Sequence, residues 1–263
     1  MIKLDTIYNM DCLEGMKVIP DGSVDAVICD LPYGTTSCKW DVVIPFVPLW
    51  EQYHRVCKPN APIVLFSQQP FTSYLLLSNI DDFKYEIIWE KTVPTGFLNA
   101  KKAPMRIHEN ILVFYANQPT YNPQMHIKHD APIGRKGSDC KKIQFGKLIT
   151  GDATKDWSYV DDGSRYPTDI VKFSNWNGSG MIQKKGTERT FHPTQKPVDL
   201  LRYLVLTYTN EGDTVLDNCM GSGTTAIACI KERRHFIGFE LSKEYFDKAV
   251  KRIDTERRQL TLF

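Results

Sequence analysis

The sequence feature that most constrains the fold is the segment 217–225, which reads Asp-Asn-Cys-Met-Gly-Ser-Gly-Thr-Thr. A short apolar run at residues 214–216 precedes it, and a helical pattern over residues 224–231 follows it. A strand, a glycine turn and a helix N-terminus in that order form a pocket for a polar cofactor. The next predicted strand, residues 235–239, leads directly into Glu240, where an acid can bind the hydroxyl groups of a ribose.

The chemistry of this pocket distinguishes two classes of cofactor. Gly221 and Gly223 allow close approach of the backbone to a ligand, and they also match the G-x-G-x-x-A pattern of dinucleotide sites. Asp217 would repel an anionic pyrophosphate, but it would attract the ammonium group of a methionine moiety. The segment therefore favours S-adenosylmethionine over a dinucleotide, and a purely structural turn is the remaining alternative.

A second segment, Asp30-Leu31-Pro32-Tyr33, also ends an apolar run, at residues 24–29. An aromatic amine is a poor nucleophile because its lone pair is delocalised, so methylating it requires an acceptor for its protons. The Asp30 carboxylate and the Leu31 carbonyl can be such acceptors. Pro32 stiffens the turn, and Tyr33 offers a ring face for stacking. Alone, the segment is more typical of an ordinary strand-ending Asp-Pro turn; paired with the glycine segment, it predicts a site where a cofactor and a planar amine meet.

The bulk composition narrows the class of protein. The chain has 263 residues, of which 42% are apolar, enough to fill the core of one large domain. It has no run of about 18 apolar residues and no apolar leader at its N-terminus, so we expect neither a membrane span nor a secretion signal. Its seven cysteines include no C-x-x-C pair, which predicts a cytoplasmic protein with reduced thiols and no metal site.

Strand and helix patterns alternate on both sides of a different middle region. Alternation of this kind predicts an α/β fold with a mostly parallel sheet and ligands at the carboxyl ends of the strands. Residues 117–189 are instead rich in Gly, Asp, Ser, Lys and Pro. We therefore expect one domain built from residues 1–116 and 190–263, with residues 117–189 as a loop-rich insert.

The middle of the chain is basic. Residues 99–190 carry 15 Lys and Arg against 9 Asp and Glu, a net charge of +6, so the remainder of this +2 chain carries −4. This asymmetry indicates either a polyanionic partner or a solvated insert. The candidate phosphate contacts are Lys101, Lys102, Arg106, Arg135, Lys136, Lys141, Lys142, Lys184 and Lys185.

Three motifs together resemble one family. Asp30-Leu31-Pro32-Tyr33 resembles the DPPY motif of the amino-methylating DNA methyltransferases, and residues 217–225 resemble their cofactor motif. Residues 192–197, His-Pro-Thr-Gln-Lys-Pro, are similar to the HPTQKP element that precedes it. The catalytic motif comes first, which resembles the permuted order of the beta group. The resemblance covers about residues 3–116 and 190–254.

The resemblance implies a fold, an activity and a set of partners. The fold is a Rossmann-like S-adenosylmethionine-dependent methyltransferase fold, with a seven-stranded sheet, one antiparallel strand and residues 117–189 as the target-recognition region. The activity is methyl transfer to N6 of adenine in double-stranded DNA, leaving S-adenosylhomocysteine. Asp30 favours adenine, and cytosine N4 is the runner-up. RNA or protein acceptors are alternatives, as is a DNA-binding module with a degenerate turn, prompted by Leu31 where the family usually has proline. Further candidate partners are a second copy of the chain and a cognate restriction endonuclease.

The resemblance also assigns roles to individual residues. It places Asp11 against the adenine of the cofactor, Thr194 and Lys196 near its carboxylate, and Phe114 against the target base. The predicted catalytic residues are Asp30, Leu31, Pro32 and Tyr33. The predicted cofactor-binding residues are Asp11, Cys12, Thr194, Lys196, Asp217, Asn218, Gly221, Ser222, Gly223, Thr224 and Glu240.

Overall fold

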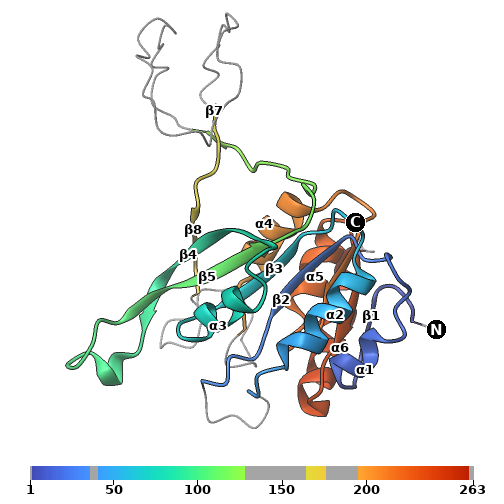
Figure 1. Cartoon of the computed structure of the whole chain (residues 1–263), viewed down its shortest axis with the longest axis horizontal. Helices are drawn as coiled ribbons and strands as arrows, with labels where there is room; N and C mark the ends of the chain where they lie inside the picture. Colours follow the sequence, from blue (N-terminus) through green and yellow to red (C-terminus); the bar gives the residue numbers. More distant parts are fainter. Residues whose placement is uncertain (1, 36–40, 128–163, 176–194, 261–263) are drawn as a thin grey trace, which may run out of the picture. The chain divides into compact units, whose positions relative to one another are not determined.

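The computed structural model describes residues 2–35, 41–127, 164–175 and 195–260. The chain divides into two compact units, one of Met1–Asn122 with Thr168–Phe263 and the other of Pro123–Pro167. The first unit holds the α/β sheet (Figure 1). In the second unit, the described residues form a two-stranded antiparallel sheet of β6 (His126–Ile127) and β7 (Ser164–Arg165).

The main sheet is mostly parallel. Its strands lie in the order β1 (Thr6–Tyr8), β10 (His235–Phe239), β9 (Thr214–Asp217), β2 (Ala26–Asp30), β3 (Ile63–Ser67), β5 (Arg106–Phe114), β4 (Phe83–Thr95) and β8 (Ile170–Phe173). Among these described strands, only β5 runs antiparallel to its neighbours. The carboxyl ends of β1, β10, β9, β2 and β3 therefore meet at one edge, which we call the carboxyl edge.

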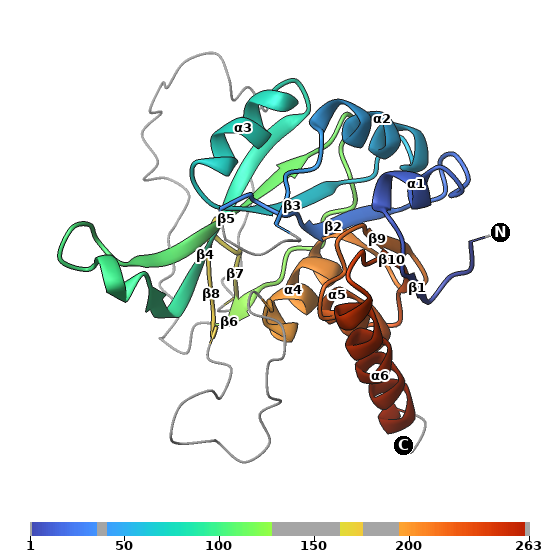
Figure 2. The same cartoon turned by 90° about the horizontal axis from the view of Figure 1, so that it is seen from below.

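Helices cover both faces of the sheet (Figures 1 and 2). One face carries α1 (Cys12–Met16), α2 (Phe46–Val56) and α3 (Phe71–Ser78), and the other carries α4 (Val198–Tyr208), α5 (Thr224–Lys231) and α6 (Lys243–Leu260). Side chains alternate between the two faces along each strand. In β2, Val27 and Cys29 pack with the first set of helices, and Ile28 packs with the second. Burial on both faces explains why this strand reads as a continuous apolar run.

A long hairpin extends the sheet at the carboxyl edge. Strands β4 and β5 pair antiparallel, and the turn between them contains a short 3₁₀ helix, η1 (Phe97–Asn99). Because β5 is antiparallel to both β3 and β4, strand β4 runs in the same direction as β3, so the turn lies on the side of the carboxyl edge. Figures 1 and 2 both show this turn reaching away from the helices.

The predicted α/β class and mostly parallel sheet are confirmed, with two differences in extent. The sheet has eight strands where seven were expected, because β8, from within the predicted insert 117–189, adds to the edge of β4. The separate unit Pro123–Pro167 is correspondingly shorter than that insert. Within the described residues, no helix combines the length and the apolar character that a membrane span requires.

Candidate active site

The two predicted motifs meet at neighbouring strand ends. Strand β2 ends at Asp30 and strand β9 ends at Asp217, and the two strands pair directly, with Val27 opposite Leu216. On the other side of β9, Asp217 pairs with Gly238 of β10, two residues before Glu240. Segments separated by nearly 190 residues in the sequence therefore lie side by side at the carboxyl edge, where parallel α/β sheets bind their ligands.

The Asp30 carboxylate has a hydrogen-bond donor on each oxygen. The Tyr33 hydroxyl donates to Oδ1 at 2.7 Å, and the Lys196 ammonium donates to Oδ2 at 2.5 Å. Burial raises the pKa of Asp30, and the charge of Lys196 opposes that rise. Lys196, expected near the carboxylate of the cofactor, is thus placed against the predicted catalytic acid.

The remainder of the catalytic turn is anchored in the core. The Leu31 side chain is 3% exposed and packs with the core beneath α1, α2 and α3, so the residue at the usual proline position contributes apolar packing. The Tyr33 ring stacks on Phe71 with centroids 5.2 Å apart, and the Lys196 ammonium lies 5.8 Å from its centroid. Burial, followed by the charge of Asp30, raises the pKa of Tyr33 well above its usual value, so the phenol stays protonated. Pro32 is half-buried within the same turn.

The glycine loop is shaped by left-handed backbone and by Glu240. Gly221 has φ 52° and Gly223 has φ 78°, conformations that favour glycine. The Gly221 N–H donates to Glu240 Oε2 at 2.9 Å, and the Ser242 N–H donates to Oε1 at 2.7 Å. Burial raises the pKa of Glu240, and these two N–H groups act against that rise. The predicted ribose ligand therefore also holds the loop in place.

Ser222 and Thr224 face into the protein. Both are about 5% exposed, and Arg252 of α6 donates from Nη1 to the Ser222 carbonyl and to Thr224 Oγ1, each at 3.0 Å. The two hydroxyl groups also hydrogen-bond to each other at 2.9 Å. These side chains therefore fix the loop on α6. Sequence reasoning missed Arg252.

Asp217 and Asn218 are both buried at the end of β9. The Cys219 N–H donates to Asp217 Oδ1 at 3.0 Å, and the Tyr53 hydroxyl donates to Asn218 Oδ1 at 2.6 Å. Burial raises the pKa of Asp217 to about 6, the Thr225 hydroxyl acting in the opposite direction. Among the described residues, the groups that act on Asp217 are Cys219, Thr225, Cys29 and Asp30, and none of them is a cation. Asp217 is therefore a buried carboxyl group suited to a cationic ligand.

The remaining predicted cofactor residues have structural roles as well. Asp11 caps helix α1 by accepting hydrogen bonds from the N–H groups of Leu13 and Glu14, and Cys12 packs in the adjacent core. Both follow β1 and so lie at the carboxyl edge. Thr194 lies outside the described residues.

The predicted DNA contacts fall into three groups. Lys101 and Lys102 are exposed in the β4–β5 turn, and Arg106, where β5 begins, donates to Gln68 Oε1 at 2.7 Å. The predicted contact between Phe114 and the target base is wrong, because the Phe114 ring is fully buried between Trp50 and Phe83. Because β5 is antiparallel, its last residue lies at the opposite edge from Asp30. Outside the described residues lie Arg135, Lys136, Lys141, Lys142, Lys184 and Lys185.

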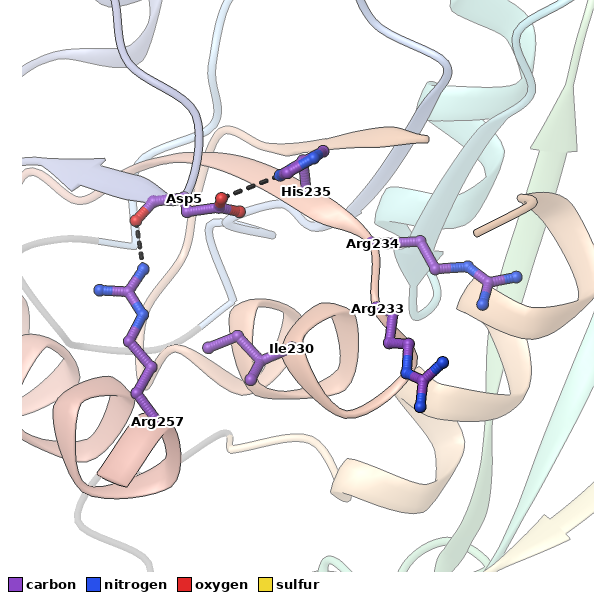
Figure 3. Close-up of a pocket in the computed structure, with 6 residues that line it drawn as sticks. All are labelled: Asp5, Ile230, Arg233, Arg234, His235 and Arg257. Atoms are coloured by element: carbon purple, nitrogen blue, oxygen red, sulfur yellow. Dashed lines mark hydrogen bonds and ion pairs between the residues drawn. The ribbon is translucent and has the colours of Figure 1, made fainter. Parts of the chain in front are cut away.

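A separate hollow of about 470 Å³ lies at the edge where the strands begin (Figure 3). Asp5 precedes β1 and His235 begins β10, so the hollow is at the opposite edge from Asp30. His235 Nδ1 lies 2.8 Å from the Asp5 carboxylate, and Arg257 donates to the Asp5 carbonyl at 2.5 Å. We therefore assign these groups to the joining of β1, β10 and α6, and we place the active site at the carboxyl edge.

Comparison with known proteins identifies the class. A family model for N6 and N4 methyltransferases, described as DNA methylase, matches residues 24–251. The chain therefore belongs to this DNA methylase family. The Type II methyltransferase M.BglII of Bacillus subtilis is 30% identical over 269 residues, which cover 94% of this chain and 68% of the relative.

Two further relatives agree with this assignment. The DNA adenine methyltransferase YhdJ of Escherichia coli K12 is 27% identical over 263 residues, covering 95% of this chain and 82% of the relative. A solved complex of M1.HpyAVI with SAM has a TM-score of 0.59 and 26% identity, covering 94% of this chain and 98% of that one.

Proposed function

We propose that this chain transfers the methyl group of S-adenosylmethionine to the exocyclic N6 of adenine in double-stranded DNA. The observation that carries the proposal is the placement of Asp30 and the glycine loop at neighbouring strand ends of one sheet edge. Aspartate at the first position of the catalytic turn and the similarity to YhdJ, a DNA adenine methyltransferase, both favour adenine.

The residues at this edge fit the cofactor. Asp217 supplies a buried carboxylate for its ammonium group, and Glu240 supplies a carboxylate for its ribose. Among the described residues, Gln195 Oε1 is buried without a hydrogen-bond partner, an acceptor next to Lys196 that suits a cationic ligand. The left-handed glycines let the loop backbone approach the ligand. When bound, the cofactor supplies an electrophilic methyl group on a sulfonium sulfur and leaves as S-adenosylhomocysteine.

The catalytic turn activates the amine. Asp30 accepts a hydrogen bond from the N–H of the base, which draws the nitrogen lone pair out of the ring, and the Leu31 carbonyl is the second acceptor. Methylation would leave a surplus proton on the nitrogen, and Asp30 would accept this proton and pass it to water. The Tyr33 hydroxyl and the Lys196 ammonium fix the carboxylate during this step.

The DNA contacts are assigned to two regions. Lys101, Lys102 and Arg106 lie on the hairpin side of the carboxyl edge, where they can contact phosphates around an extruded base. Residues 117–189 are the target-recognition region, a role supported by their basic charge. A second copy of the chain and a cognate restriction endonuclease are further candidate partners, the latter suggested by relatives named Type II methyltransferases.

The test is transfer of tritiated methyl groups to unmethylated bacterial DNA, followed by nucleoside analysis. We expect N6-methyladenine with the wild-type chain, none with Asp30→Ala, and unchanged activity with Asp81→Ala, which removes an exposed carboxylate remote from the site. N4-methylcytosine would overturn the adenine assignment. Binding of DNA without any methylated product would overturn the enzymatic proposal.

A further inference from the structure

A row of four alternating charges runs from the catalytic turn into strand β4. Lys91, Glu109, Lys196 and Asp30 are linked in that order by three ion pairs. We infer that Glu109, held by Lys91, is a positioning residue that shares the Lys196 ammonium with Asp30 and so keeps Asp30 a strong acceptor for the substrate amine. This inference rests on the proposed methyl transfer.

Strand geometry places the members of this row on one face of the sheet. Ile28 and Ile111 pack beneath α4, α5 and α6, and Asp30 and Glu109 each lie two residues from one of them, on the same face. Glu109 is opposite Trp89 in the β4–β5 pairing, so Lys91, two residues further on, is its diagonal neighbour on that face. Lys196 comes from the segment immediately before α4, the helix that covers this face.

The contacts show an unequal division of Lys196 between the two carboxylates. Its Nζ lies 2.5 Å from Asp30 Oδ2 and 3.4 Å from Glu109 Oε2. Glu109 Oε2 is buried and has no hydrogen bond among the described residues, whereas Oε1 is paired with Lys91. The side chains of Lys196 and Glu109 are only 8% and 12% exposed, so water screens these charges little. Glu109 therefore attracts the Lys196 ammonium, but the ammonium stays closer to Asp30.

The other polar groups around Asp30 add no positive charge that would offset the four charges of this row. Tyr33 and Cys29 come from the same strand end, and Asp217 faces Asp30 from β9. The tyrosine is neutral because its pKa is raised by burial, and Cys29, with a pKa raised to about 12 by burial, is neutral as well. Apart from Asp217, which is negative, the charged groups that act on the ionisation of Asp30 are therefore Lys196 and Glu109.

The two neighbours act on Asp30 in opposite directions. Burial has the largest effect on the pKa of Asp30 and raises it; after burial, Lys196 lowers this pKa and Glu109 raises it. Burial acts to raise the pKa of Glu109, but Lys196 and Lys91 outweigh it and lower that pKa, so Glu109 is ionised. A carboxylate whose pKa is raised is a better proton acceptor, and this is the property that the amine of the substrate requires.

The test measures the ionisation of Asp30 directly and separately from activity. Carboxyl-carbon NMR of aspartate-labelled protein, assigned with Asp30→Asn, gives its titration midpoint without cofactor or DNA. We expect Glu109→Gln to lower this midpoint by about one pH unit and Lys196→Met to raise it by about as much. Glu256→Gln, which breaks an ion pair between α5 and α6, is the matched control and leaves the midpoint unchanged.

Single-turnover methyl transfer over a range of pH gives the second readout. Because transfer requires ionised Asp30, the acid limb of the rate moves with the NMR midpoint, and Glu109→Gln also lowers the plateau rate several-fold. An unchanged midpoint in Glu109→Gln overturns the inference, as does a uniform loss of rate at every pH with no movement of the limb. If Glu109→Gln does not fold, the double variant Lys91→Met with Glu109→Leu is expected to lower the midpoint likewise. A wild-type chain that transfers no methyl group would refute the proposed function, while the NMR midpoints would still decide the inference.

Discussion

Replacing Arg252 with methionine tests how strongly helix α6 supports the glycine loop. Arg252 is 7% exposed, and one of its guanidinium nitrogens holds both the Ser222 carbonyl and the Thr224 hydroxyl. Arg252→Met keeps most of the apolar stem of this side chain and removes the donor. Two buried acceptors then lose their charged partner.

The size of the effect follows from these two hydrogen bonds. Hydrogen bonds to charged groups contribute about 1.5 to 3 kcal/mol each, and a buried acceptor left without a partner costs about 1 to 3 kcal/mol. The variant also avoids the free-energy cost of burying the guanidinium charge, which offsets part of this loss. We therefore expect the free energy of unfolding to fall by about 3 kcal/mol. Part of this lost free energy had kept the glycine loop ordered, so in the variant cofactor binding must order the loop. The Kd for S-adenosylmethionine should therefore rise about tenfold, equivalent to about 1.4 kcal/mol.

Urea unfolding and titration calorimetry with S-adenosylmethionine measure the two quantities. Lys251→Met is the matched control, because it removes a cation from the adjacent, exposed position of the same helix. We expect it to change stability by less than about 0.5 kcal/mol. If Arg252→Met matched Lys251→Met in both assays, α6 would not be what holds the loop.

Three further predictions concern DNA binding, pH and packing. Replacing Lys101 and Lys102 together with glutamine should weaken binding to all DNA sequences and reduce the salt slope by about 1.8, which is about 0.9 for each phosphate contact; a changed target base would contradict this. Since burial raises the pKa of Asp217 to about 6 from an ordinary 3.8, its ionisation destabilises the fold as pH rises through that interval. Wild type should therefore lose about 3 kcal/mol relative to Asp217→Asn between about pH 4 and about pH 7, and parallel pH curves in urea unfolding would refute this. In Gly238→Ala, the new Cβ would lie 2.8 Å from Cγ2 of Ile7, a stiff β-branched side chain, so we expect the free energy of unfolding to fall by about 1 to 3 kcal/mol, and equal or greater stability in urea would disprove the clash.

The sequence was sufficient to predict most of the sheet. Apolar runs that end in an acid located β2 and β9 to within two residues, because strands buried on both faces have continuous apolar stretches. Strand β8 was missed because it has only four residues and its partner lies about 80 residues away in β4. The direction of β5 cannot be read from its apolar run, so the sequence did not reveal that Phe114 lies at the opposite end of the strands from Asp30.

The site was predictable where a residue belongs to a local motif. Asp30, Asp217 and Glu240 each follow a recognisable strand. The contact of Lys196 with Asp30 spans 166 positions, and Glu109 sits at the start of an apolar run with no motif around it. Arg252 lies in a helix of mostly charged residues, where an arginine is normally expected to face water. All three depend on pairings that only the assembled fold establishes.

The reversed course of β5 separates two tasks that must be performed at one place. Because β5 runs antiparallel to β4, the turn between them projects on the side of the carboxyl edge, whereas the side chains that reach the site, Lys91 and Glu109, lie within the two strands. That turn can be lengthened, shortened or recharged without disturbing the strand ends that activate the amine. Exchanging the β4–β5 turn between related chains is therefore a direct way to change the DNA contacts while the reaction itself is preserved.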